Sequence, residues 1–278
     1  MPVPLTDTRP FFRPLSGEIV ALLRALGDDD WERPTMAGAW LVRDVVAHLL
    51  DTALRRLSMH RDGLKLPPAA RPSAIGGDLV AFINTLNATW IRAAQRLSPR
   101  VITDLYAQAS AELADFVETL APDVVAVWPV SWAGDTQSPQ WLDIGREFTE
   151  VWHHGAQIRE AVGAGPFSEP HWLRAVLQIA LHALPFAYRG VPGDSDSSVA
   201  IVITGKASGT WTLHHDHGLW DVDEGHRINP TATVTMSEEV AWRLFFNALP
   251  FPEARSQVRL TGDAALALPL LRARSVIV

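Results

Sequence analysis

The chain has 278 residues, no cysteine and a formal net charge of -7 at pH 7. This acidic balance argues against a nucleic-acid-binding protein, because phosphate binding requires a basic surface. Without cysteine, the chain has no disulfide, no thiolate metal ligand and no thiol nucleophile of its own. Hydrophobic residues make up 47% and charged residues 20%, which is typical of a globular protein, and the length favours two domains.

The sequence predicts neither a signal peptide nor a membrane span. The first ten residues contain no basic segment that leads into an apolar one. The densest apolar run, residues 264–271, is far shorter than a membrane span and contains a proline. We therefore expect a cytoplasmic protein.

Apolar residues recur at helical spacing through the first two thirds of the chain. The predicted helices cover residues 11–26, 41–62, 78–97, 103–120, 141–163 and 170–188. Prolines indicate a loop at residues 64–77, and residues 124–132 have the character of a short extended run. Asp44 lies in the first turn of its predicted helix, where a carboxylate can accept hydrogen bonds from free backbone N–H groups.

After residue 197, apolar and polar residues alternate with a period of two between glycine turns, as in an antiparallel meander. The predicted strands cover residues 199–205, 209–216, 218–223, 230–236 and the segment from residue 258. Ser237 is the expected N-cap of a helix over residues 237–247. We expect a mainly α N-terminal domain at residues 1–166 and a smaller α+β domain with an antiparallel sheet at residues 167–278.

The most informative stretch for chemistry is the predicted helix at residues 141–163. Glu150 and His154 lie four residues apart, so they share one face of that helix. A carboxylate and an imidazole placed in this way can bind one cation if a third ligand comes from elsewhere. His153 is an equal alternative to His154 by periodicity alone, and such pairs are often only surface contacts. His48 is the candidate third ligand, or a core histidine with one satisfied nitrogen.

Two segments carry a resemblance to a known family. The first is W-E-R-P-T-M-A-G-A-W-L-V-R-D-V-V-A-H-L at residues 31–49, and the second is E-x-W-x-H-G at residues 150–155, with a glycine nine residues after the histidine. Both resemble the DinB-like, mycothiol-dependent maleylpyruvate isomerase family. The matching positions are Trp40, Arg43, Asp44, His48, Glu150, Trp152, His154, Gly155 and Gly163. This alignment favours His154 over His153, and P-T-A-T-V-T-M-S-E-E-V near the C-terminus resembles a sterol-carrier-like domain.

The resemblance implies a DinB-like four-helix bundle that binds a divalent metal through His48, Glu150 and His154. Two imidazoles and one carboxylate leave positions open for water or substrate, as in catalytic sites. Zinc is the expected ion, and nickel or iron suits the same ligands. The open position in isomerase-like members would bind a small thiol such as mycothiol as a thiolate, which then adds to an electrophilic small molecule.

Two positions depart from the family pattern, and one further family residue cannot be placed by motif. Gln157 stands where the family often has an aspartate, and a neutral amide would polarise a ligand more weakly. Leu41 replaces the usual serine or threonine, so half of a capping box is missing. The isomerase has an arginine in its C-terminal domain, and the candidates for it here are Arg227 and Arg243. Each of them also fits a surface charge.

Three functions therefore remain open. The first is an enzyme that uses a metal-activated small thiol for S-transfer or for cis–trans isomerisation. The second is a metal-dependent hydrolase that acts through metal-bound water. The third is a binding protein whose C-terminal domain holds an apolar ligand or a partner, with a metal that is only structural.

Overall fold

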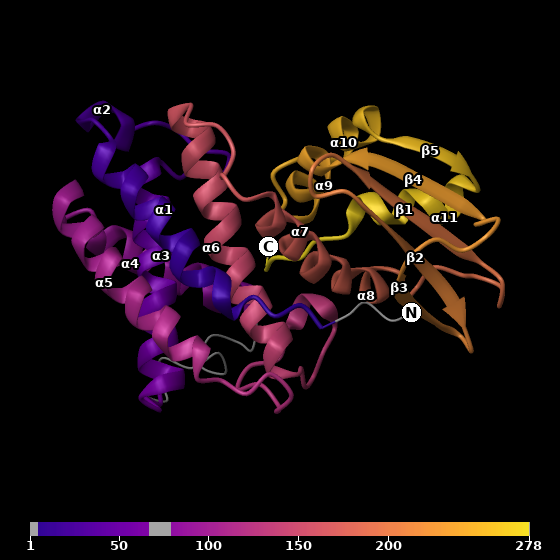
Figure 1. Ribbon diagram of the computed structural model, residues 1–278, viewed down its shortest axis with the longest axis horizontal. Helices are drawn as coiled ribbons and strands as arrows, with labels where there is room; N and C mark the ends of the chain where they lie inside the picture. The colour runs from indigo at the N-terminus through magenta and orange to yellow at the C-terminus, as the bar shows by residue number, and fades with distance from the viewer. Residues whose placement is uncertain (1–4, 67–78, 278) are drawn as a thin grey trace. The chain divides into compact units, whose positions relative to one another are not determined.

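The computed structural model describes residues 5–66 and 79–277 (Figure 1). The chain forms two compact units, which we call the helical unit and the sheet unit. The helical unit contains Thr8–Ala121 and Glu150–Phe167, and the sheet unit contains Met1–Asp7, Pro122–Thr149 and Ser168–Val278. The domain boundary predicted between residues 166 and 167 stays a prediction. From residue 67 onward, the loop predicted at residues 64–77 lies outside the described residues.

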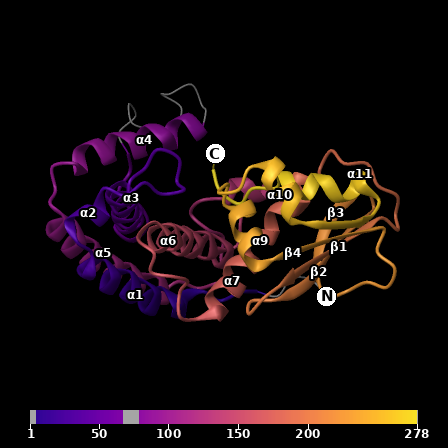
Figure 2. The same cartoon turned by 90° about the horizontal axis from the view of Figure 1, so that it is seen from above.

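The helical unit is built from the four helices expected in the first 120 residues. They are α1 (Phe12–Ala25), α3 (Val42–Arg55), α4 (Leu79–Ala94) and α5 (Pro99–Glu118), with the short α2 (Asp28–Trp31), the 3-10 turn η1 (Arg9–Phe11) and the π-helical turn η2 (Arg56–Arg61). Helix α5 packs against both α1 and α3, and α4 packs against α3 (Figure 2). The helix-rich N-terminal part is therefore confirmed, and within the described ranges no helix has the length and apolar character that crossing a membrane requires.

The buried faces of these helices follow from their sequence periodicity. In α1, Leu15, Ile19 and Leu23 recur every four residues and are almost completely buried. Burial of each such side chain contributes about 1.5–3 kcal/mol of transfer free energy. Helix α5 begins with a proline, and the Ser98 hydroxyl accepts a hydrogen bond from the Val101 amide. Local signals and apolar spacing thus agree on where these helices lie.

Helix α6 (Gln140–Val162) confirms the helix predicted at residues 141–163. Its residues from Glu150 onward belong to the helical unit. There Gly155 lies directly against α1, because a Cβ added at this position would lie 2.8 Å from Ile19 Cδ1 and 2.7 Å from Phe167 Cζ. The absence of a side chain at Gly155 therefore permits α6 to pack closely against Ile19 of α1 and against Phe167.

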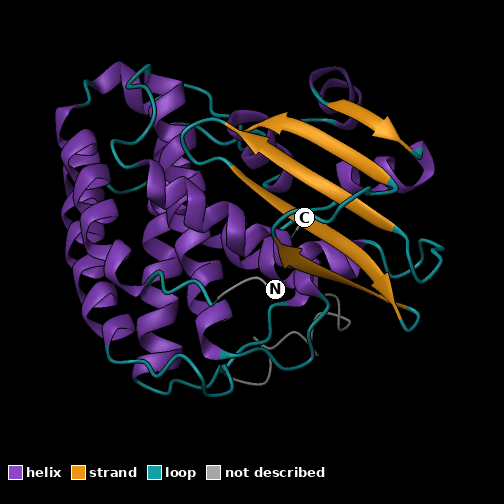
Figure 3. Ribbon diagram, turned by 45° about the vertical axis from the view of Figure 1, so that its right-hand side comes forward, coloured by secondary structure: helices purple, strands orange, loops and turns teal. Residues whose placement is uncertain are grey.

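The strands of the sheet unit are drawn in orange in Figure 3. They form a five-stranded sheet in the order β3-β2-β1-β4-β5. The strands are β1 (Ser198–Thr204), β2 (Gly209–Asp216), β3 (Leu219–Glu224), β4 (Ala232–Ser237) and β5 (Arg259–Gly262). The predicted meander of β1, β2 and β3 is confirmed, since both of its pairs are antiparallel. Strand β4 instead pairs with β1 in parallel, so the sheet is antiparallel in three of its four pairings. Alternation of apolar and polar residues predicts a strand but not the strand beside it, because parallel and antiparallel pairing bury the same face.

The remaining helices of the sheet unit follow the prediction only in part. They are α7 (Pro170–Ala180), α8 (Leu184–Ala187), α9 (Glu238–Phe245), α10 (Phe251–Gln257) and α11 (Ala264–Ala267), with the 3-10 turns η5 (Ser131–Ala133), η6 (Leu181–Ala183) and η7 (Leu268–Arg272). Ser237 caps α9 as expected, because its hydroxyl accepts a hydrogen bond from the Val240 amide.

The structure of this unit departs from the expected elements in three places. The single helix predicted at residues 170–188 is broken by η6, because Pro185 has no N–H to continue the helical ladder. The extended run at residues 124–132 forms no strand in the described structure and makes only an isolated bridge between Val125 and Pro139. Helix α10 was not predicted, since its seven residues are too short to show a clear period.

Candidate metal centre

The structure brings His48, Glu150 and His154 together within the helical unit. One ligand atom from each side chain lies within 4.8 Å of the other two. His48 Nε2 is 3.6 Å from Glu150 Oε2, and His154 Nε2 is 3.4 Å from the same oxygen. Among the described residues, this is the one group of three such side chains with metal-ligand spacing. Helix α3 supplies His48, and one face of α6 supplies the other two.

The separations of these donor atoms fit a shared ion better than direct hydrogen bonds. An N–H···O hydrogen bond usually spans about 2.7–3.2 Å, which is shorter than both measured distances. Two ligand atoms that each lie about 2.0–2.1 Å from a tetrahedral ion are about 3.3–3.5 Å apart. The residues present therefore fit a small divalent cation.

The position of His48 follows from the start of α3. The Leu41 amide donates to Asp44 Oδ2 over 3.1 Å, while the Leu41 side chain can accept nothing in return. This is the half capping box expected from the sequence. From that start, α3 carries His48 on its buried side, where only 6% of the residue is exposed.

Gln157 orients the second histidine. Its side-chain oxygen lies 2.7 Å from His154 Nδ1 and can only accept a hydrogen bond, so this contact selects the ring form with N–H at Nδ1. In the neutral ring, a proton on Nδ1 makes Nε2, which lies 3.4 Å from Glu150 Oε2, the atom available to bind a cation. Gln157 stands where the family often has an aspartate, and in the structure its amide still contacts Nδ1 of His154.

Burial and charge keep two of the ligands in the protonation state that metal binding requires. Burial lowers the pKa of His48 from 6.5 to about 4, so this imidazole is neutral at pH 7. Burial alone would raise the pKa of Glu150, but the facing imidazoles of His154 and His48 outweigh it and hold that pKa well below its usual value. Neither group has to lose a proton before binding a cation at neutral pH.

Trp40 forms an aromatic wall beside both histidines. Its ring centroid is 5.0 Å from that of His48 and 6.1 Å from that of His154. The Trp40 carbonyl accepts hydrogen bonds from the amide and the hydroxyl of Thr35, which hold its loop in place. His48 Nδ1 is buried and has no hydrogen-bond partner in the described part of the chain, so packing against these rings sets the orientation of His48.

The other sequence candidates lie outside this group. His153 is buried with its ring 4.0 Å from that of His154, but it does not belong to the cluster. Arg227 and Arg243 are in the sheet unit. Arg227 forms an ion pair with Asp223, and Arg243 forms one with Glu239, in each case four residues earlier in the sequence. Both contacts agree with the interpretation of surface charges.

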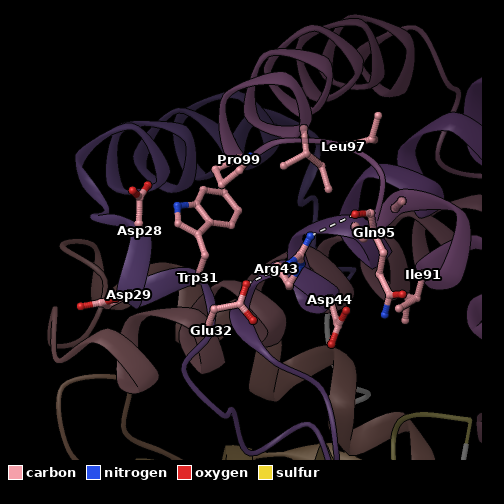
Figure 4. Close-up of a pocket in the computed structure, with 13 residues that line it drawn as sticks. Asp28, Asp29, Trp31, Glu32, Arg43, Asp44, Ile91, Gln95, Leu97 and Pro99 are labelled. Carbon is pink, nitrogen blue, oxygen red and sulfur yellow. Dashed lines mark hydrogen bonds and ion pairs between the residues drawn. The ribbon is translucent and has the colours of Figure 1, made fainter.

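A separate cavity of about 350 Å³ lies in the helical unit (Figure 4). Its lining includes Asp28, Trp31, Ile91 and Arg43, and none of the three candidate ligands. Arg43 donates to Glu32 and to the Gln95 carbonyl at this cavity. The guanidinium is therefore already paired within the cavity wall.

Comparisons with known proteins agree with this architecture. The family model "Mycothiol maleylpyruvate isomerase N-terminal domain" matches residues 12–159. A crystal structure of the mycothiol-dependent maleylpyruvate isomerase is similar over 87% of this chain and 88% of its own, with 12% identity and a TM-score of 0.53. A histidine-to-alanine mutant of that isomerase is similar over 94% and 95%, with 12% identity and a TM-score of 0.54. At this identity, the likeness shows a shared fold.

Sterol Carrier Protein 2 Like 2 from Aedes aegypti covers 30% of this chain and 78% of its own, with 23% identity and a TM-score of 0.25. No curated protein matches the chain.

Proposed function

Because the chain belongs to the family of the mycothiol maleylpyruvate isomerase N-terminal domain, we propose that it is a metal-dependent enzyme that uses a small thiol. The proposed reaction is S-transfer to an electrophilic small molecule, or its cis–trans isomerisation. The observation that carries this proposal is the convergence of His48, Glu150 and His154 inside the family segment.

The donor set supports a catalytic site more than a structural one. Two imidazoles and one carboxylate leave coordination positions free, whereas structural zinc sites use four protein ligands. We propose zinc as the ion, with nickel or iron as the alternatives that suit these donors. When bound, such an ion would lower the pKa of a thiol and hold it as a thiolate at neutral pH.

The protein's own residues would bind the ion and orient its ligands. His48 and His154 present their Nε2 atoms, and the partly exposed Glu150 brings a negative charge. Burial of the two imidazoles limits screening by water. The chain contains no cysteine, so in the proposed reaction the nucleophilic sulfur would come from a small thiol such as mycothiol. The printed name of the family supports mycothiol as this cosubstrate.

Metal content tests the site directly. Protein purified without chelators should contain about one divalent ion per chain by elemental analysis. His48→Ala and His154→Ala should each lose most of it, and His153→Ala is the matched control that should retain it. Loss in His153→Ala with retention in His154→Ala would show the ligand assignment to be wrong. A metal-free wild-type protein would reject the site.

A turnover assay then tests the chemistry. Mycothiol and a panel of electrophilic substrates should give turnover that requires both the thiol and the metal, and that falls in His154→Ala. Metal-dependent turnover in the absence of any thiol would instead identify a hydrolase.

A further inference from the structure

Gln157 is a buried amide in direct contact with a candidate metal ligand. We propose that Gln157 is a positioning residue whose neutrality leaves the metal centre positively charged, so that the centre favours an anionic ligand over a neutral one. This inference rests on the proposed metal site and deepens it, because it names the class of molecule that the open position takes: a thiolate or a carboxylate.

The contact itself is well defined. Gln157 is only 3% exposed, and its side-chain oxygen is 2.7 Å from His154 Nδ1. The two residues are three apart on α6 and therefore share one face of the helix. Metal-binding histidines usually donate this ring proton to a carboxylate, a backbone carbonyl or water. An amide oxygen accepts the same proton but brings no charge.

The charges around the cluster follow from its residues. Glu150 is the one carboxylate among the three donors. Outside them, Arg55 adds positive potential at His48 and forms an ion pair with Asp51 over 3.2 Å. A divalent ion with one carboxylate and two neutral imidazoles keeps a net positive charge. A carboxylate at position 157 would cancel that charge, whereas Gln157 leaves it in place.

This positive charge acts on an incoming ligand only if the ligand is charged. A negative charge added at position 157 would repel an anion at the open position. Two unit charges several ångströms apart at an effective dielectric constant of about 20 repel strongly enough to weaken anion binding by roughly ten- to fiftyfold. A neutral ligand would be almost unaffected. The ratio of the two affinities therefore isolates the effect of charge from that of structure.

The experiment uses the full chain loaded with Co²⁺, whose visible absorption reports both metal binding and exogenous ligands. Azide serves as the anionic probe and imidazole as the neutral one. In Gln157→Glu, the azide Kd should rise by about tenfold or more, and the imidazole Kd should stay within about threefold. Affinity for Co²⁺ should be equal or higher, because a carboxylate makes His154 a stronger donor. Gln95→Glu adds the same charge at an exposed position and should change neither the azide Kd nor the imidazole Kd.

A second variant tests positioning without adding charge. Gln157→Leu removes the acceptor for His154 Nδ1, and Co²⁺ affinity should fall by about 10- to 100-fold, with the azide-to-imidazole ratio of the loaded protein unchanged. Unchanged Co²⁺ affinity in this variant would overturn the positioning role.

The outcomes separate this inference from the function on which it rests. An unchanged azide affinity in Gln157→Glu, or equal weakening of azide and imidazole, overturns the inference alone. Failure of the wild-type chain to bind Co²⁺ or Zn²⁺ overturns the proposed metal site, and the inference with it.

Discussion

Acid should destabilise the metal-free protein through His48. Burial lowers the pKa of this imidazole from 6.5 to about 4 in the folded state. As the pH falls below 6.5, the unfolded chain takes up a proton at His48 that the folded chain does not accept. The stability contributed by the neutral buried ring is therefore fully present above pH 6.5 and is lost as the pH falls towards 4.

The size of this loss follows from the displaced pKa. At about 1.4 kcal/mol for each pH unit between the two pKa values, the free energy of unfolding should fall by roughly 2–3 kcal/mol between pH 7.5 and pH 4.5. Other titrating groups also contribute to acid destabilisation. The informative quantity is therefore the difference between the wild type and His48→Gln, which keeps a polar side chain but cannot take up the proton.

Urea unfolding in the presence of a chelator measures this difference. The loss of stability between the two pH values should be smaller in His48→Gln than in the wild type by about 2–3 kcal/mol. The exposed His226 supplies the control, and His226→Gln should behave like the wild type. Equal losses in the wild type and His48→Gln would refute the argument that burial keeps this imidazole neutral.

Two further predictions concern packing and capping. Gly155→Ala places a methyl group against Ile19 and Phe167, and the overpacking cost of about 1–3 kcal/mol should exceed the gain in helix propensity of about 1 kcal/mol. Gly17→Ala, in α1 with no neighbour within 4 Å of the added carbon, should instead stabilise the protein by up to about 1 kcal/mol. Thermal unfolding measures both variants, and equal shifts of their melting temperatures would contradict close packing at Gly155. Asp44→Ala removes the acceptor for the Leu41 amide and should cost about 1 kcal/mol in urea unfolding, whereas an unchanged midpoint would show that water replaces the cap.

Much of the fold could be predicted because its signals are local. The period of the apolar residues predicted α1, α3, α4, α5 and α6, and alternation between glycines predicted the β1–β3 meander. The predictions are wrong where the structure depends on contacts between segments that are distant in sequence. The parallel pairing of β4 with β1 joins strands that are distant in sequence, and alternation does not encode a strand's neighbour.

The same distinction applies to the candidate metal centre. Glu150 and His154 share a helical face by their spacing, so the sequence alone determined that they point the same way. About a hundred residues separate them from His48, and no local rule specifies that distance. Only the packing of α3 and α6 brings His48 Nε2 to 3.6 Å from Glu150.

Tertiary structure also decided the surroundings of these side chains. The sequence predicts that Gln157 polarises a ligand more weakly than the usual aspartate, and it marks Trp40 only as a motif position. Their contacts with His154 and His48 depend on side-chain directions and burial, which a one-dimensional pattern does not contain. Residue types and spacing thus determined which groups were available for a metal, and three-dimensional packing decided their distances, their protonation and the neutral partner of His154.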